Sequence, residues 1–133
     1  MTLDKALDIL RDYPTDRKAW ELVYSGLTPE LVAYVSSTLF TFSMPSEDAG
    51  DIVHDSFISV MQHWHEVSEQ INGPGDLLAY LKRTARNKLI DRYRHERTAT
   101  KLLAFLSLTF GTAFRGEISV YRRLFLEQVI ANL

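Results

Sequence analysis

The stretch DAGDIVHDSFISVM, residues 48–61, has the apolar spacing of a helix with two different sides. At about 100° per residue its apolar side chains gather on one side, and the opposite side is acidic and polar. The apolar group, which extends to the next turn, consists of Val53, Phe57, Val60, Met61 and Trp64. The polar group consists of Asp48, Asp51, Asp55, Ser59 and Gln62. We therefore expect a helix with one buried face and one acidic face.

Signals for the ends of this helix lie on both sides of it. Ser46 follows a proline and suits an N-cap, and the acids after it place negative charge in the first turn, where the helix dipole favours it. The pattern continues to about Val67. A polar loop with glycine and proline, residues 68–75, then ends at Asp76, which we expect to cap the next helix.

The second informative stretch, YLKRTARNKLIDRYR at residues 80–94, lies in that next helix, which is predicted to reach about Arg97. Its inward stripe is expected to consist of Leu78, Leu81, Ala85 and Leu89. A second stripe consists of Tyr80, Arg83, Asn87, Ile90 and Arg94. This second stripe is mostly polar, so burial in a core does not explain it.

The N-terminal part is also predicted to be helical. A first helix over residues 3–13 has Leu3, Ala6, Leu7 and Leu10 on one side. A longer helix follows over about residues 15–40, with a break near Gly26 and Pro29 as an open alternative. Its core candidates are Trp20, Val23, Leu27, Leu31, Tyr34 and Val35.

No stretch shows the period-two alternation of a sheet, so the predicted fold is all-α, a compact bundle of about four helices with an extra C-terminal helical segment. The 133 residues suffice for one compact domain, and 46% hydrophobic and 24% charged residues are typical of a folded protein. Without cysteine there is no disulfide framework and no thiolate metal site. The acidic N-terminus does not resemble a signal peptide, and the apolar run at 102–114 is shorter than the roughly 20 residues of a membrane span.

The charges are divided unevenly along the chain. Residues 1–70 hold 4 Lys/Arg and 12 Asp/Glu, whereas residues 71–133 hold 11 and 5, so the halves carry −8 and +6. Between residues 82 and 101 there are eight basic residues and two acidic ones. This distribution predicts a surface that faces a polyanion and an acidic surface left for a different partner.

Both stretches resemble bacterial RNA polymerase sigma factors of the sigma-70 family, extracytoplasmic-function group. The family commonly reads DAEDLVQEVFLRVW in its second conserved region, and the matches here are Asp48, Ala49, Asp51, Val53 and Phe57. Gly50 and His54 depart from it. The next signature, an aromatic residue followed by LYRIARNLAIDRLRR, is matched by Tyr80, Leu81, Arg83, Ala85, Arg86, Asn87, Asp91, Arg92 and Arg94, and the departures are Lys82, Thr84, Lys88 and Tyr93. The resemblance covers about residues 15–101.

The resemblance implies a non-enzymatic transcription initiation factor domain that binds core RNA polymerase and recognises and melts the promoter minus-ten element. The polymerase partner is a coiled coil of the largest subunit, and the residues implied to bind it are Asp48, Asp51, His54 and Asp55. His54 either donates where the family has Gln or is an ordinary surface histidine. Carboxylates in this arrangement accept charge-assisted hydrogen bonds from basic side chains.

For the non-template strand of the minus-ten element, the implied DNA-binding residues are Tyr80, Arg83, Arg86, Asn87, Arg92 and Arg94. Capture of a single strand needs cations for phosphates and polar or aromatic groups for unstacked bases. Tyr80 either stacks on a base or packs in the core. Residues 68–76 resemble in position the family's specificity loop for one flipped-out base.

Two other classes of function compete with this interpretation. One is a stand-alone helical regulator that binds duplex DNA, although no short helix-turn-helix spacing is evident around residues 80–97. The other is a metal-dependent enzyme, but His63 and His65 lie about 200° apart on a helix and do not share an ion locally. We therefore expect no catalytic activity, no bound metal and no cofactor.

The expected domain organisation is a sigma region 2 domain over residues 1–101 and a linker with the start of a truncated region 4 over residues 102–133. The final run LFLEQVIANL resembles the opening helix of that region, which predicts a fragment or a truncated homologue. The resemblance also implies a cytoplasmic location, no membrane partner and an anti-sigma factor as a further partner.

Overall fold

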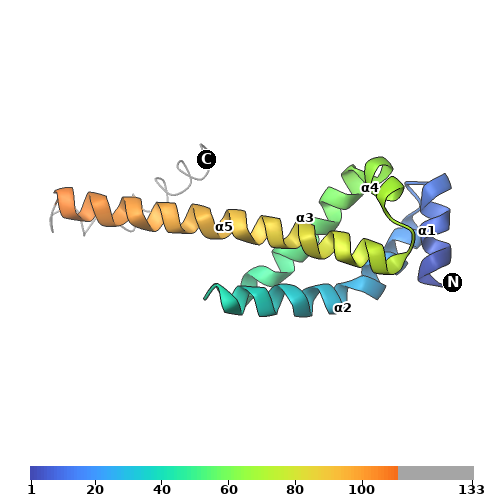
Figure 1. Cartoon of the computed structure of the whole chain (residues 1–133), viewed down its shortest axis with the longest axis horizontal. Helices are drawn as coiled ribbons and strands as arrows, with labels where there is room; N and C mark the ends of the chain where they lie inside the picture. The colour runs from blue at the N-terminus through green and yellow to red at the C-terminus, as the bar shows by residue number, and fades with distance from the viewer. Residues whose placement is uncertain (111–133) are drawn as a thin grey trace. The chain divides into compact units, whose positions relative to one another are not determined.

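A computed structural model describes residues 1–110 of the chain, and these residues are almost entirely helical (Figure 1). The helices are α1 (Leu3–Asp12), α2 (Arg17–Thr41), the short 3-10 helix η1 (Ser46–Asp48), α3 (Ala49–Gln62), α4 (Trp64–Gln70) and α5 (Pro74–Phe110). No strand occurs among the described residues. The predicted all-α class is confirmed.

The chain divides into two compact units, Met1–Leu89 and Ile90–Leu133. The first unit contains α1 to α4 and the first half of α5, and it holds most of the buried apolar residues. The described part of the second unit is the remainder of α5. The predicted fourth helix was expected to end near Arg97, whereas α5 continues to Phe110. The final run LFLEQVIANL lies outside the described residues.

Helix α1 forms as its sequence predicts. The Thr2 hydroxyl accepts a hydrogen bond from the Lys5 backbone N–H at 3.2 Å and so caps the helix. Ala6, Leu7 and Leu10 are buried. The helix stops before Pro14, and Asp16 then caps α2 by accepting from the Ala19 N–H at 2.9 Å.

Helix α2 runs without a break, and Pro29 lies inside it. Proline donates no hydrogen bond to the preceding turn, so the helix is held there by its buried side chains. These are Ala19, Trp20, Val23, Leu27, Leu31, Val35 and Leu39. Gly26 has a packing role, since an added Cβ would lie 2.8 Å from Leu3 Cδ2 of α1. Tyr34, a core candidate, is only half-buried.

The start of the third predicted helix differs from the expectation. Ser46 does not cap it, because residues 46–48 form the 3-10 turn η1 without a side-chain cap, and α3 begins at Ala49. A break also occurs at His63, whose backbone leaves the helical region, and Trp64–Gln70 then forms the separate helix α4. Part of the predicted loop is therefore helical, and only residues 71–73 connect α4 to α5.

Asp76 does not occupy the cap position that the sequence suggested. Helix α5 begins at Pro74, whose missing N–H costs nothing in the first turn of a helix. Asp76 lies within that turn, and its carboxylate accepts from the Asn72 N–H at 2.9 Å. This bond reaches back from the helix to the connection, much as the acid of a capping box does.

Two tryptophans occupy the centre of the first unit. The rings of Trp20 and Trp64 meet edge to face with centroids 5.0 Å apart. Trp64 Nε1 donates to the Leu10 carbonyl at 2.9 Å, and Trp20 Nε1 donates to the Pro14 carbonyl at 2.7 Å. Both polar ring atoms are thus satisfied, and they tie α4 and α2 to the N-terminal segment.

Candidate functional site

The exposed face of α3 carries the acidic residues that the sequence pattern placed there. Asp51, His54 and Asp55 are exposed, and Asp48, at the N-terminal end of the helix, is half-buried. Residues three and four apart are neighbours on a helix surface, so these side chains form one acidic patch. The opposite face is buried through Ala49, Ile52, Val53, Ser56, Phe57 and Val60.

One residue of the predicted inner face of α3 was assigned wrongly. Met61 is 46% exposed, and Ile52 and Ser56 are buried instead, so the buried face is rotated toward them. The buried Ser56 hydroxyl has a hydrogen-bond partner within the helix, because it donates to the Ile52 carbonyl at 2.6 Å. Met61 lines an open groove of about 590 Å³ together with Trp20, Tyr24 and the Pro14 segment.

In the first unit, α5 presents a basic and polar surface. Arg83, Arg86 and Asn87 are exposed, and Tyr80 is half-buried. The helix is held by a buried stripe of Leu77, Leu81, Ala85 and Leu89, each fully shielded from solvent. The prediction named Leu78, which is half-buried, where Leu77 is found; the two positions lie three and four residues before Leu81, so both neighbour it on a helix.

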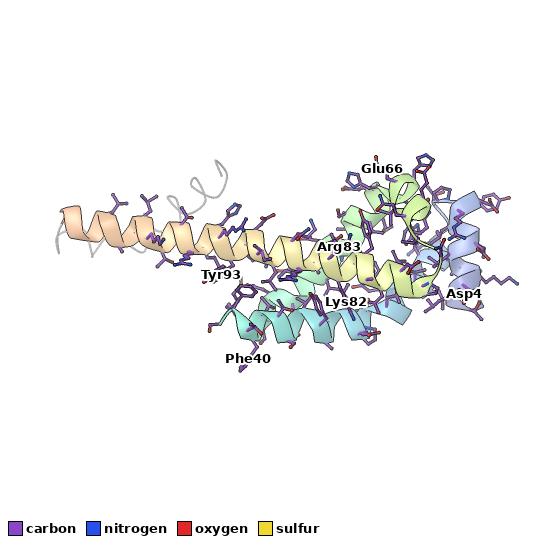
Figure 2. All side chains as sticks on the ribbon, viewed as in Figure 1. Asp4, Phe40, Glu66, Lys82, Arg83 and Tyr93 are labelled. Atoms are coloured by element: carbon purple, nitrogen blue, oxygen red, sulfur yellow. The ribbon has the colours of Figure 1, made fainter. Side chains whose placement is uncertain are left out.

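Lys82 does not belong to that exposed surface, although the sequence groups it with the basic run. Its Nζ lies 3.5 Å from Glu30 Oε1 and 5.5 Å from the centre of the Tyr34 ring, both on α2. Figure 2 shows Lys82 on the side of α5 that faces α2. The contact with a residue 52 positions away has no local sequence signal.

In the second unit, Arg94 is exposed, and Ile90 and Arg92 are half-buried. All the candidates for DNA binding are thus on α5, and none of them is buried. The arrangement provides both cations for phosphates and an amide for base edges.

The model of the family sigma-70 region 2 matches residues 29–99. The chain belongs to this family. The match includes α3 and the stretch of α5 that carries the basic residues, whereas α1 and the start of α2 precede it. No curated protein and no solved structure matches the chain.

Membership in the sigma-70 region 2 family has a general functional meaning. Such a domain is a non-enzymatic part of a transcription initiation factor, and it binds RNA polymerase and recognises the minus-ten element of promoters. The matched residues include the acidic surface of α3 and the basic surface of α5.

Two histidines of this sigma region 2 domain, His63 and His65, have local partners. His63 Nδ1 lies 2.9 Å from the Ser59 carbonyl, and His65 Nε2 lies 3.4 Å from Glu69. Within residues 1–110, His, Asp and Glu side chains form no group of three or more that would hold a metal ion. In the same range, no helix is long and apolar enough to cross a membrane.

Proposed function

We propose that this domain binds core RNA polymerase through the acidic surface of α3 and holds the melted non-template strand of the minus-ten element on α5. The observation that carries the proposal is the placement of exposed carboxylates on one helix and exposed cations on another, both inside the family match. In this proposal the polymerase performs the chemistry, and the domain supplies the binding surfaces.

The polymerase contact consists of Asp48, Asp51, His54 and Asp55. The exposed Asp51 and Asp55 lie one turn apart on α3, and within residues 1–110 neither of them forms a salt bridge. Their natural partner is a helix with basic side chains, such as the coiled coil of the largest polymerase subunit. Opposite charges on two such surfaces speed association and reject partners of the wrong charge.

The DNA contact consists of Tyr80, Arg83, Arg86, Asn87, Arg92 and Arg94. The arginines neutralise phosphates, and Asn87 offers a donor and an acceptor to a base edge. Tyr80 is half-buried, which leaves part of its ring for an unstacked base. In this arrangement the phosphate contacts contribute most of the affinity, and Asn87 contributes the preference for one base sequence over another.

Finer assignments follow from the motifs rather than from the fold. The matches in residues 48–61 and 80–94 favour the extracytoplasmic-function group, with a cytoplasmic location and an anti-sigma factor as a further partner. Residues 1–101 form the region 2 domain in this proposal, and residues 102–133 form a linker and the start of region 4.

A comparison of DNA forms tests the proposal. Fluorescence anisotropy at fixed salt would compare a single-stranded minus-ten oligonucleotide, selected from a random pool, with its duplex, in the presence of the polymerase coiled coil. We expect the single strand to bind more tightly. Tighter binding to the duplex, without dependence on the coiled coil, would favour a stand-alone duplex-binding regulator and contradict the proposal.

A further inference from the structure

The connection between α4 and α5, residues 71–73, is fastened by three hydrogen bonds. The Ile71 carbonyl accepts from Arg11 Nη2 at 3.2 Å, and the Asn72 N–H donates to Asp76 Oδ2 at 2.9 Å. The Gly73 carbonyl accepts from the Leu77 N–H at 3.1 Å. Ile71 is 4% exposed, so the connection is also anchored by its side chain.

Of these three hydrogen bonds, the one from Arg11 is the bond that comes from a distant part of the sequence, 60 positions away. Its guanidinium also pairs with Asp8 Oδ1 at 3.2 Å on the same helix, which limits the directions in which it can point. Helix α1 is itself held in place, because the Leu10 carbonyl accepts from the buried Trp64 Nε1. The donor to Ile71 is therefore presented from a fixed support.

Helix α1 approaches the connection at a second point. A Cβ added to Gly73 would lie 3.7 Å from Asp4 Oδ1, which is ordinary contact distance. Figure 1 shows α1 beside the place where α4 passes into α5. Two residues of a helix outside the family match thus lie against two residues inside it, Ile71 and Gly73.

The connection leads directly into the helix that carries the proposed DNA contacts. Arg83 lies ten positions after Gly73, which corresponds to about 15 Å along a helix, a length that a few nucleotides span. Asn72 is exposed, and its amide offers a donor and an acceptor at that end of α5. A strand that follows α5 toward its N-terminus would meet Asn72 next.

We propose that Arg11 is a positioning residue for minus-ten recognition: by holding the Ile71 carbonyl it fixes the orientation in which Asn72 meets a base of the melted strand. This inference rests on the proposed function. Arg11 makes no DNA contact in this role. It acts through the backbone of residues 71–73, so its loss should affect the choice of base more than the strength of binding.

The test compares Arg11→Met with Arg17→Met in the full chain. Both changes remove a guanidinium that is paired with an acid on its own helix, but only Arg11 reaches the connection. The probe is the single strand selected by the wild type, together with strands that change one base at a time. At the base that meets Asn72, we expect Arg11→Met to reduce the discrimination about threefold to tenfold, the scale of one typical hydrogen bond.

Affinity for a scrambled strand should change less than about twofold in the same variant, because the phosphate contacts on α5 remain. Arg11→Lys should restore most of the discrimination, since an ammonium still donates to the carbonyl. Amide hydrogen exchange gives an independent measure. The Asn72 N–H should exchange faster in Arg11→Met than in Arg17→Met.

Each result has one meaning. A wild type without preference among single strands overturns the proposed function and this inference with it. A wild type that discriminates, with Arg11→Met discriminating equally well, overturns the positioning role alone. If Arg11→Met does not fold, Arg11→Ala takes its place, since alanine likewise has no donor for the Ile71 carbonyl, and equal discrimination in that variant overturns the proposal in the same way.

Discussion

At the scale of single residues, Trp64 joins more parts of the first unit than any other side chain that we have described. It is 4% exposed, meets the Trp20 ring and donates to the Leu10 carbonyl. Its position, directly after the break at His63, lets one ring hold α4, α2 and α1 together. The helical period correctly predicted that Trp64 is buried, but it gave no sign of the hydrogen bond to Leu10.

Replacement of Trp64 by alanine should lower the free energy of unfolding by about 3–5 kcal/mol, the usual cost of removing a large buried aromatic residue. Phe40→Ala is the control, because Phe40 is 86% exposed and its loss should change stability by less than about 0.5 kcal/mol. Urea denaturation followed by circular dichroism measures both. Equal effects of the two changes would contradict the central role of Trp64.

Asn87 and Arg86 are neighbours on α5 with different expected roles. Asn87→Ala should lower the discrimination between the selected minus-ten strand and a scrambled strand by about 1–3 kcal/mol, the scale of one base-specific contact. Arg86→Ala should weaken both strands alike, since phosphates carry no sequence information. Anisotropy titrations with the two strands separate these effects. If Asn87→Ala leaves the preference unchanged, its assignment to a base edge is wrong.

At the scale of secondary-structure elements, the sequence predicted most helices but misplaced several of their ends. The period of the apolar residues is a property of a whole helix, and it correctly predicted α1, the buried side of α2 and most of the buried side of α3. The ends depend on single backbone conformations. Ser46 was expected to cap a helix but lies in η1. The break at His63 has no proline or glycine beside it that would predict it.

Helix α2 contains a proline, Pro29, in its interior. Pro29 is exposed in the interior of the helix, where it removes one backbone hydrogen bond. Pro29→Ala should raise the free energy of unfolding by about 1–2 kcal/mol, because the gain in helix stability exceeds the entropy that the unfolded chain regains. Ser37→Ala, an exposed change in the same helix, should have an effect of about 0.5 kcal/mol or less. A destabilised Pro29→Ala in thermal or urea unfolding would show that the proline has a role in packing.

The acidic surface of α3 can be tested as a unit. Asp51→Arg combined with Asp55→Arg should abolish co-elution with core polymerase and leave helicity intact, because both positions are exposed and like charges would then meet. Glu66→Arg combined with Glu69→Arg is the matched control, since it makes the same change of charge on exposed positions of α4. Size-exclusion chromatography with purified core enzyme gives the readout. Unchanged co-elution of the α3 double variant would contradict the polymerase assignment.

At the scale of the whole molecule, a net charge of −2 conceals two oppositely charged halves. The sequence predicts this asymmetry, because it follows from a count of charged residues. The sequence does not predict which cations are available to a ligand, since that depends on contacts between distant parts of the chain. Lys82 shows the difference: it belongs to the basic run, yet Glu30 and Tyr34 on α2 engage it. The effective basic surface is smaller than the count suggests.

The salt dependence of DNA binding measures that effective surface. If α5 contacts about four phosphates, a plot of log affinity for single-stranded minus-ten DNA against log salt should have a slope near −3, or about −0.7 for each phosphate. Arg83→Ala should flatten the slope by about 0.7, because Arg83 is exposed and its counterion release is lost. Lys82→Ala is the control and should leave the slope unchanged, since its ammonium already has partners within the protein. Anisotropy titrations between low and moderate salt give all three slopes. A slope near zero for the wild type would mean that the basic residues of α5 are only solvated surface. If Arg83→Ala and Lys82→Ala flatten the slope equally, Lys82 leaves Glu30 when DNA binds.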